Sequence, residues 1–169
     1  MTEQKKWYGT KQIAAILDIP EWRVKNFTEG AAYGLPPSAL PFGKGRGSRR
    51  LYTDQDLLRF AIADELVNCG FTPEDVGEAV REISESMLTS WTEQWIDEHK
   101  RTQLPILVNV HGEWRVRKQA EVKKLASEVL SNDDWRGLFI LNFPSLLESV
   151  VQGITELEAE GKLPGGKQK

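Results

Sequence analysis

The chain has 169 residues, of which 40% are hydrophobic and 28% charged, a composition typical of a folded globular protein with one domain or two small ones. No apolar run approaches the roughly 18 residues of a membrane-spanning helix, and the first residues lead into no apolar stretch typical of a secretory signal. One cysteine and two histidines exclude an internal disulfide and disfavour a zinc site, so we expect a cytoplasmic protein without a metal or cofactor.

The charge is distributed unevenly. Residues 1–60 contain ten basic and six acidic residues, a net charge of +4, whereas the remaining 109 residues contain 12 basic and 19 acidic residues, a net charge of −7. A basic head on an acidic body is typical of a protein that contacts nucleic acid at one end, although a difference of this size also arises by chance.

Two short helices joined by a tight turn are predicted near the N-terminus. Thr10 is suited to cap the first helix, and apolar residues at helical spacing follow it. Pro20 is suited to the first turn of a second helix over about 21–27, in which Val24 and Phe27 form the buried pair. This pattern is typical of a helix-turn-helix.

Residues 30–52 are rich in glycine and proline, which excludes a helix. Residues 40–42 and 49–52 are predicted to pair as short strands. The tip between them carries four positive charges and no negative one, from Lys44, Arg46, Arg49 and Arg50.

Two well-capped helices are predicted next. Thr53 is suited to cap the first, which ends at Gly70, and Thr72 with Pro73 is suited to begin the second, whose apolar spacing continues through Ile83 and Met87. The polar segment 84–103 is expected to be helical as well.

The C-terminal third shows a different periodicity. Strands are predicted over 106–110 and 114–117, and a buried strand over 138–143. A last helix is expected from Ser145, in a capping box with Glu148, to Gly161. A helix between the second and third strands has its apolar side at Val122, Leu125, Val129 and Leu130.

The order of the N-terminal elements resembles the MerR family of bacterial regulators. Residues 8–14 (YGTKQIA) resemble the family's opening helix, 17–27 (LDIPEWRVKNF) its turn and recognition helix, and 49–52 (RRLY) the return strand of its wing. Asp56-Leu57 and 69–76 (CGFTPEDV) are similar to its third and fourth helices. The resemblance covers about half of the chain.

The chain also departs from this family. The family usually has glycine at the position of Asp18 and a hydroxyl residue at that of Pro20. A long dimerisation helix and an effector domain usually follow the fourth helix, whereas this chain has a small α/β segment. Without a cysteine constellation the metal-responsive branch is disfavoured, and the family's inducer chemistry is not carried over.

We therefore predict a mostly α fold with small β content. A winged helix-turn-helix DNA-binding domain spans 1–83 and a helical connector spans 84–103. A small α/β domain for dimerisation or for partner or effector binding spans 104–161, and a disordered tail spans 162–169.

The predicted recognition helix would read base edges in the major groove of double-stranded DNA. Its outward residues are Trp22, Arg23, Lys25 and Asn26, and the resemblance puts Lys25 where the family usually has arginine. The alternatives are a Trp22 half-buried against the wing, and solvated surface roles for Arg23 and Lys25.

The wing would contact phosphates and the minor groove through Lys44, Arg46, Arg49 and Arg50, the alternative being a flexible surface loop. Lys11, Gln12 and Tyr52 are further candidates for backbone contacts, although Tyr52 is equally suited to the core.

No catalytic residues are predicted, because no nucleophile has a base at convincing spacing. We expect Trp91, Trp95, Trp114 and Trp135 in core or dimer packing. The apolar seam of the last helix would contact either its own sheet or a partner subunit.

These features predict a homodimeric transcription regulator of the bacterial nucleoid that binds specific double-stranded DNA. Two alternatives remain open. One is an excisionase-like recombination or DNA-architectural factor, and the other is a winged-helix protein-interaction module. The operator, the direction of regulation and any effector are not predicted.

Overall fold

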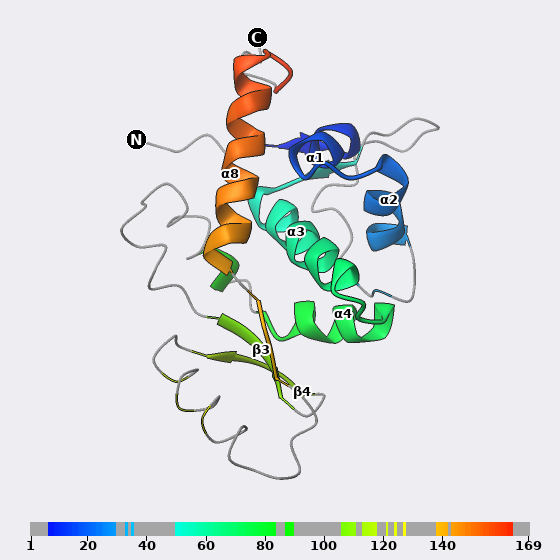
Figure 1. Cartoon of the computed structure of the whole chain (residues 1–169). Coiled ribbons are helices and arrows are strands. Elements are labelled where there is room, and N and C mark those ends of the chain that lie inside the picture. The colour runs from blue at the N-terminus through cyan, green and yellow to red at the C-terminus, as the bar shows by residue number, and fades with distance from the viewer. Residues whose placement is uncertain are drawn as a thin grey trace.

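The computed structural model describes residues 7–29, 33, 35, 50–83, 87–89, 106–110, 113–117, 121, 124, 127, 138–141 and 143–163. These residues are mostly helical, with two small antiparallel sheets (Figure 1), which confirms a mostly α fold with small β content. No helix among them is long and apolar enough to cross a membrane.

The first sheet joins the start of the chain to the segment before the third helix. β1 (Tyr8–Gly9) pairs antiparallel with β2 (Leu51–Tyr52), with Tyr8 opposite Tyr52. β2 confirms part of the strand predicted over 49–52. It pairs with β1, while the partner predicted at 40–42 lies outside the described residues.

The side chain of Tyr8 links β1 to Asp54, which follows β2 by two residues. This side chain is buried, and its hydroxyl donates a hydrogen bond of 2.7 Å to Asp54 Oδ1. Burial, and then the negative charge of Asp54, raise the pKa of this phenol well above its ordinary value.

α1 (Thr10–Ile16) and α2 (Glu21–Glu29) are the two predicted short helices. The predicted cap is wrong by one residue: because the chain enters from β1 with an extended Gly9, Thr10 is already helical. The Gln12 side chain then accepts the Gly9 N–H at 2.8 Å. α1 closes through Asp18, which has a left-handed φ of 52°.

α3 (Asp54–Asn68) and α4 (Pro73–Arg81) confirm both predicted caps. Each begins with a reciprocal capping box, Thr53 with Asp56 in α3 and Thr72 with Asp75 in α4. α3 closes at Gly70, whose φ is 89°.

The predicted continuation of this fourth helix is wrong at residues 82–83, which form a turn and a bend after Arg81. Ile83 is buried in the core. Residues 87–89 are helical again, and the rest of the predicted connector lies outside the described residues.

The second sheet has the strand order β4-β3-β5 among the described residues. β3 (Ile106–Val110) and β4 (Glu113–Arg117) form the predicted hairpin. β5 (Leu138–Ile140) is shorter than the buried strand predicted over 138–143. It lies at an edge of the sheet, which leaves Ile140 40% exposed.

Residues 121, 124 and 127 are helical and exposed, at the spacing of one solvent face. The apolar residues predicted for the other side of this helix are not among the described side chains.

α8 (Phe143–Ala159) begins two residues earlier than predicted. The capping box expected at Ser145 is wrong, because Pro144 already occupies the first turn, where proline is favoured. The helix closes at Gly161, with a φ of 67°. The Lys162 N–H donates to the Leu157 carbonyl at 3.0 Å, so the predicted disordered tail is wrong for residues 162–163.

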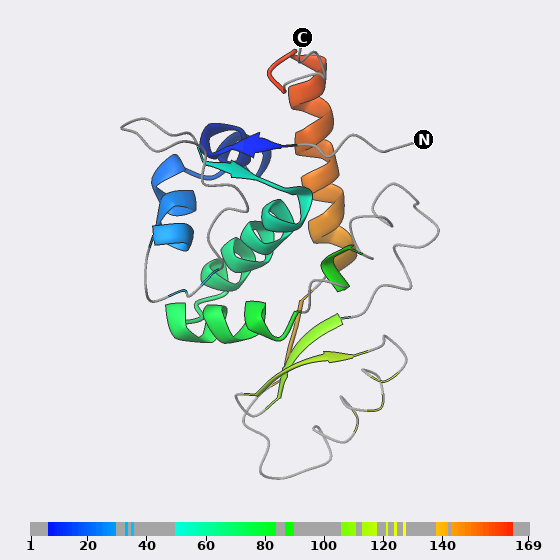
Figure 2. The same ribbon diagram turned by 180° about the vertical axis from the view of Figure 1, so that it is seen from behind.

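α8 packs beside α1 and α3, as both views of the molecule show (Figure 2). The two backbones approach closely at Gly153, where an added Cβ would lie 2.2 Å from the Ile16 carbonyl oxygen. The apolar seam of α8 is buried within this chain, through Leu147, Val150, Ile154 and Leu157.

Buried apolar residues of the described chain form one cluster from Tyr8 to Leu157. The last helix of the predicted C-terminal domain is therefore part of the core that supports α1 and α3.

Candidate nucleic-acid interface

α2 separates an anchored face from an exposed face. Val24 and Phe27 are fully buried, whereas Trp22 is 58% exposed and Lys25 and Asn26 are exposed. The three exposed residues are three and four positions apart, so they share one side of the helix. An outward-projecting Trp22 is thus what the structure shows, not a half-buried one.

Arg23 has a different environment from its neighbours on α2. Its Nη1 lies 2.7 Å from Asp64 Oδ1 and 3.1 Å from Asn68 Oδ1, both at the end of α3. The Arg23 side chain is only 25% exposed. Arg23 therefore braces α2 against α3 through Nη1.

Arg50 links the first sheet to the end of α2. Its Nη1 lies 2.9 Å from Glu29 Oε1 and 3.2 Å from Thr28 Oγ1, and the side chain remains 44% exposed. These contacts place one predicted wing cation beside α2. Lys44, Arg46 and Arg49 lie outside the described residues.

The three further residues predicted to contact the DNA backbone differ in their exposure to solvent. Lys11 is exposed on α1. Gln12 makes two contacts within the chain, since its amide nitrogen also donates to the Lys162 carbonyl at 3.0 Å. Tyr52 is 1% exposed and packs edge-to-face on Phe60, so its proposed contact with DNA is wrong and its core alternative is the one found.

Acidic residues balance the described cations of this surface. The basic residues placed on or beside α1 and α2 are Lys11, Arg23, Lys25 and Arg50. The acidic residues there, four as well, are Asp18, Glu21, Glu29 and Asp64. The described residues on and beside α1 and α2 therefore carry no net positive charge, and three of the four basic residues of the tip, Lys44, Arg46 and Arg49, lie outside the described residues.

Sequence analysis did not find the two partners of Arg23. Asp64 and Asn68 lie 41 and 45 positions after Arg23. One signal was present, since Asp64 and Asn68 are polar residues four apart near the end of α3, and they are hydrogen-bonded to each other at 2.9 Å.

Neither protein-family models nor curated protein sequences yield a match to this chain.

Proposed function

We propose that this chain is a sequence-specific DNA-binding regulator. In this proposal α1 and α2 form a helix-turn-helix, and residues 30–52 form its wing. The observation that carries it is the division of α2, whose buried Val24 and Phe27 fix the helix while Trp22, Lys25 and Asn26 project from it.

The exposed face has side chains suited to the major groove. The Asn26 amide can donate to and accept from the edge of an adenine, and Lys25 can donate to guanine or to phosphate. Trp22 offers an apolar surface for a thymine methyl group. A helix inserts such residues directly among the base edges.

The paired arginines support this face rather than read bases. Arg23 fixes α2 to α3, and Arg50 fixes the end of α2 to β2. Because the proposed recognition helix is held at both ends, it loses little conformational freedom on binding, which favours affinity for DNA. We therefore assign base reading to Trp22, Lys25 and Asn26, and assign positioning to Arg23.

Non-specific attraction to DNA is assigned to the tip of the wing. Because the described charges around α2 cancel, Lys44, Arg46 and Arg49 would supply the phosphate contacts that release counterions.

The element order supports a MerR-like regulator that acts as a homodimer on two related half-sites in the bacterial nucleoid. Since the apolar seam of α8 is buried in its own chain, we assign the dimer contact to another surface.

Fluorescence anisotropy with labelled duplex DNA across a salt series tests the proposal. We expect binding that weakens steeply with salt, and a Lys25→Ala variant that lowers affinity and reduces the salt slope by about 1. Asn26→Ala should lower specific affinity by about 1–3 kcal/mol and leave non-specific binding unchanged.

Lys124→Ala is the matched control, because Lys124 is exposed outside α2. Absence of duplex binding, or binding insensitive to salt and to the α2 variants, would refute the proposal and favour a protein-interaction module.

A further inference from the structure

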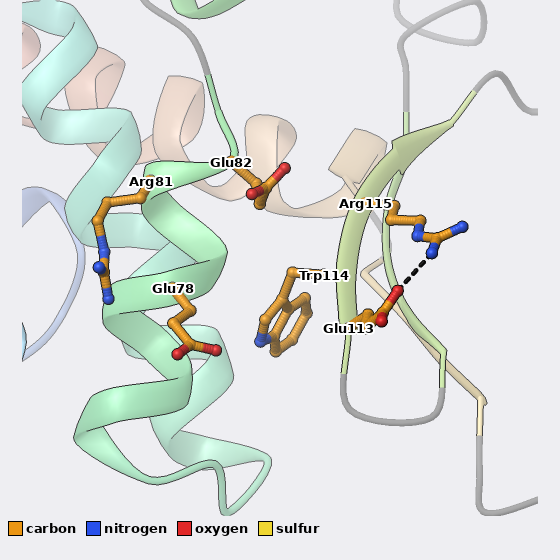
Figure 3. Close-up of a pocket in the computed structure, with 6 residues that line it drawn as sticks. All are labelled: Glu78, Arg81, Glu82, Glu113, Trp114 and Arg115. Carbon is orange, nitrogen blue, oxygen red and sulfur yellow. Dashed lines mark hydrogen bonds and ion pairs between the residues drawn. The ribbon is translucent and has the colours of Figure 1, made fainter.

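A hollow of about 450 Å³ lies between α4 and β4 (Figure 3). It is lined by Glu78, Arg81, Glu82, Glu113, Trp114 and Arg115. Figure 3 shows the Trp114 ring pointing toward α4, with Glu82 above the ring and Glu78, on α4, to its left in this view. Arg81 points away from the ring. Glu113 and Arg115, which line the rim of the hollow, project from β4 away from the Trp114 ring, as strand alternation requires.

The Trp114 indole is fixed in place and has an unused donor. The side chain is 5% exposed, and Nε1 has no hydrogen-bond acceptor among the described residues. Phe71 and Phe139 hold the ring, with centroids 5.0 and 6.0 Å from it. A buried N–H without an acceptor is unfavourable, so an oxygen atom brought to this position would be stabilised.

The charges around the hollow favour a cation. Three carboxylates and two guanidinium groups line it, a net charge of −1, and Glu113 is paired with Arg115. Arg81 keeps its charge but points away from the Trp114 ring, and its Nε–H donates to the Gly77 carbonyl at 2.9 Å. Glu78 and Glu82 are exposed and four residues apart on one helix, a spacing at which like charges repel. A positive group placed between them would remove this repulsion.

We propose that this hollow binds a small organic cation that also carries a carbonyl or hydroxyl oxygen. An ammonium or guanidinium group lies between Glu78 and Glu82, and the oxygen accepts the Trp114 indole N–H. Exposed side chains change rotamer within nanoseconds, so Glu78 and Glu82 can open the way to the indole. This site goes beyond the DNA-binding proposal and does not depend on it.

Nitrogen-edited NMR of the indole N–H groups tests the site. The probe is argininamide, and agmatine is its matched partner with the same two cationic groups but no carbonyl oxygen. Trp114→Phe assigns the Trp114 signal among those of the six tryptophans. We expect argininamide to move this signal downfield in a saturable way, and agmatine to bind more weakly and leave it nearly in place.

The carboxylates are tested by Glu78→Gln and Glu82→Gln. Together these should weaken argininamide binding about tenfold or more, since each removes a charge-assisted hydrogen bond. Glu148→Gln together with Glu156→Gln on α8 removes the same two charges; it is the control and should have no effect. The site is refuted if millimolar argininamide moves no Trp114 signal, if agmatine moves it equally, or if the Gln variants bind as the wild type does.

Discussion

Replacing Gly153 by alanine tests the packing that joins the last helix to the first. The added Cβ would lie 2.2 Å from the Ile16 carbonyl oxygen, 3.0 Å from its carbonyl carbon and 3.1 Å from its Cα. All three are backbone atoms, so no side-chain rotation relieves the clash. α8 must move away from α1, and nearby buried residues such as Val150 and Ile154 lose contacts.

The magnitude follows from two opposing effects. Overpacking of this kind costs about 1–3 kcal/mol, and more where backbone must move. Alanine in a helix interior recovers about 1 kcal/mol relative to glycine. Because backbone must move here, we take about 2–3 kcal/mol for the clash. We expect a net loss of about 1–2 kcal/mol, which corresponds to a melting temperature lower by about 2–8 °C for a chain of this size.

Thermal and urea unfolding measure this loss. Thr155→Ala in the same helix is the control, because Thr155 is exposed and the substitution changes only helix propensity and the hydrogen bond from its hydroxyl to the Val151 carbonyl. If Gly153→Ala stabilised the protein, as alanine does in an open helix, the close approach of α8 to Ile16 would not exist in solution.

Three further substitutions test local features. Asp18→Gly should raise the free energy of unfolding by about 0.5–1 kcal/mol, because Asp18 has a left-handed φ that costs glycine least; urea unfolding showing a loss would contradict this. Thr53→Ala should lower it by about 1 kcal/mol through loss of the α3 cap, and an unchanged urea midpoint would count against the capping box. Folding raises the pKa of Tyr8 above 10, the ordinary value for tyrosine. The contribution of Tyr8 to the free energy of unfolding is therefore complete below pH 10 and is lost as the pH rises above it. Stability measured at about pH 9 and about pH 11 should therefore fall more in the wild type than in Tyr8→Phe, and equal losses would show that this phenol is not responsible.

The features that sequence predicted well depend on neighbouring residues. The caps at Thr53 and Thr72 and the turn at Gly70 rest on contacts within six positions, so their residue types suffice to find them. The hairpin of β3 and β4 is similar, because alternation and a short connection fix its register.

The features that it missed depend on distant partners. The sequence pattern of α2 predicts that Arg23 points outward. The partner of Arg23 cannot be predicted in this way, because only folding brings Asp64 Oδ1 to 2.7 Å from its Nη1. Gly153 carries no local signal of its contact with Ile16, which lies on the first helix. The start of α8 was misplaced because two signals compete there, and proline in the first turn prevailed over a serine cap.

The entry of α2 into the major groove is tested most directly by affinity cleavage of a bound duplex. The chain has one cysteine, so a Cys69→Ser background accepts a single new cysteine carrying an iron chelate. Glu21→Cys places the chelate at the exposed start of α2, outside the residues assigned to base reading, and Ser149→Cys places it on the exposed face of α8 as the control. We predict cleavage at a few adjacent nucleotides from position 21 and none from position 149. Equal cleavage from both positions, or none from position 21 of a bound complex, would contradict the account.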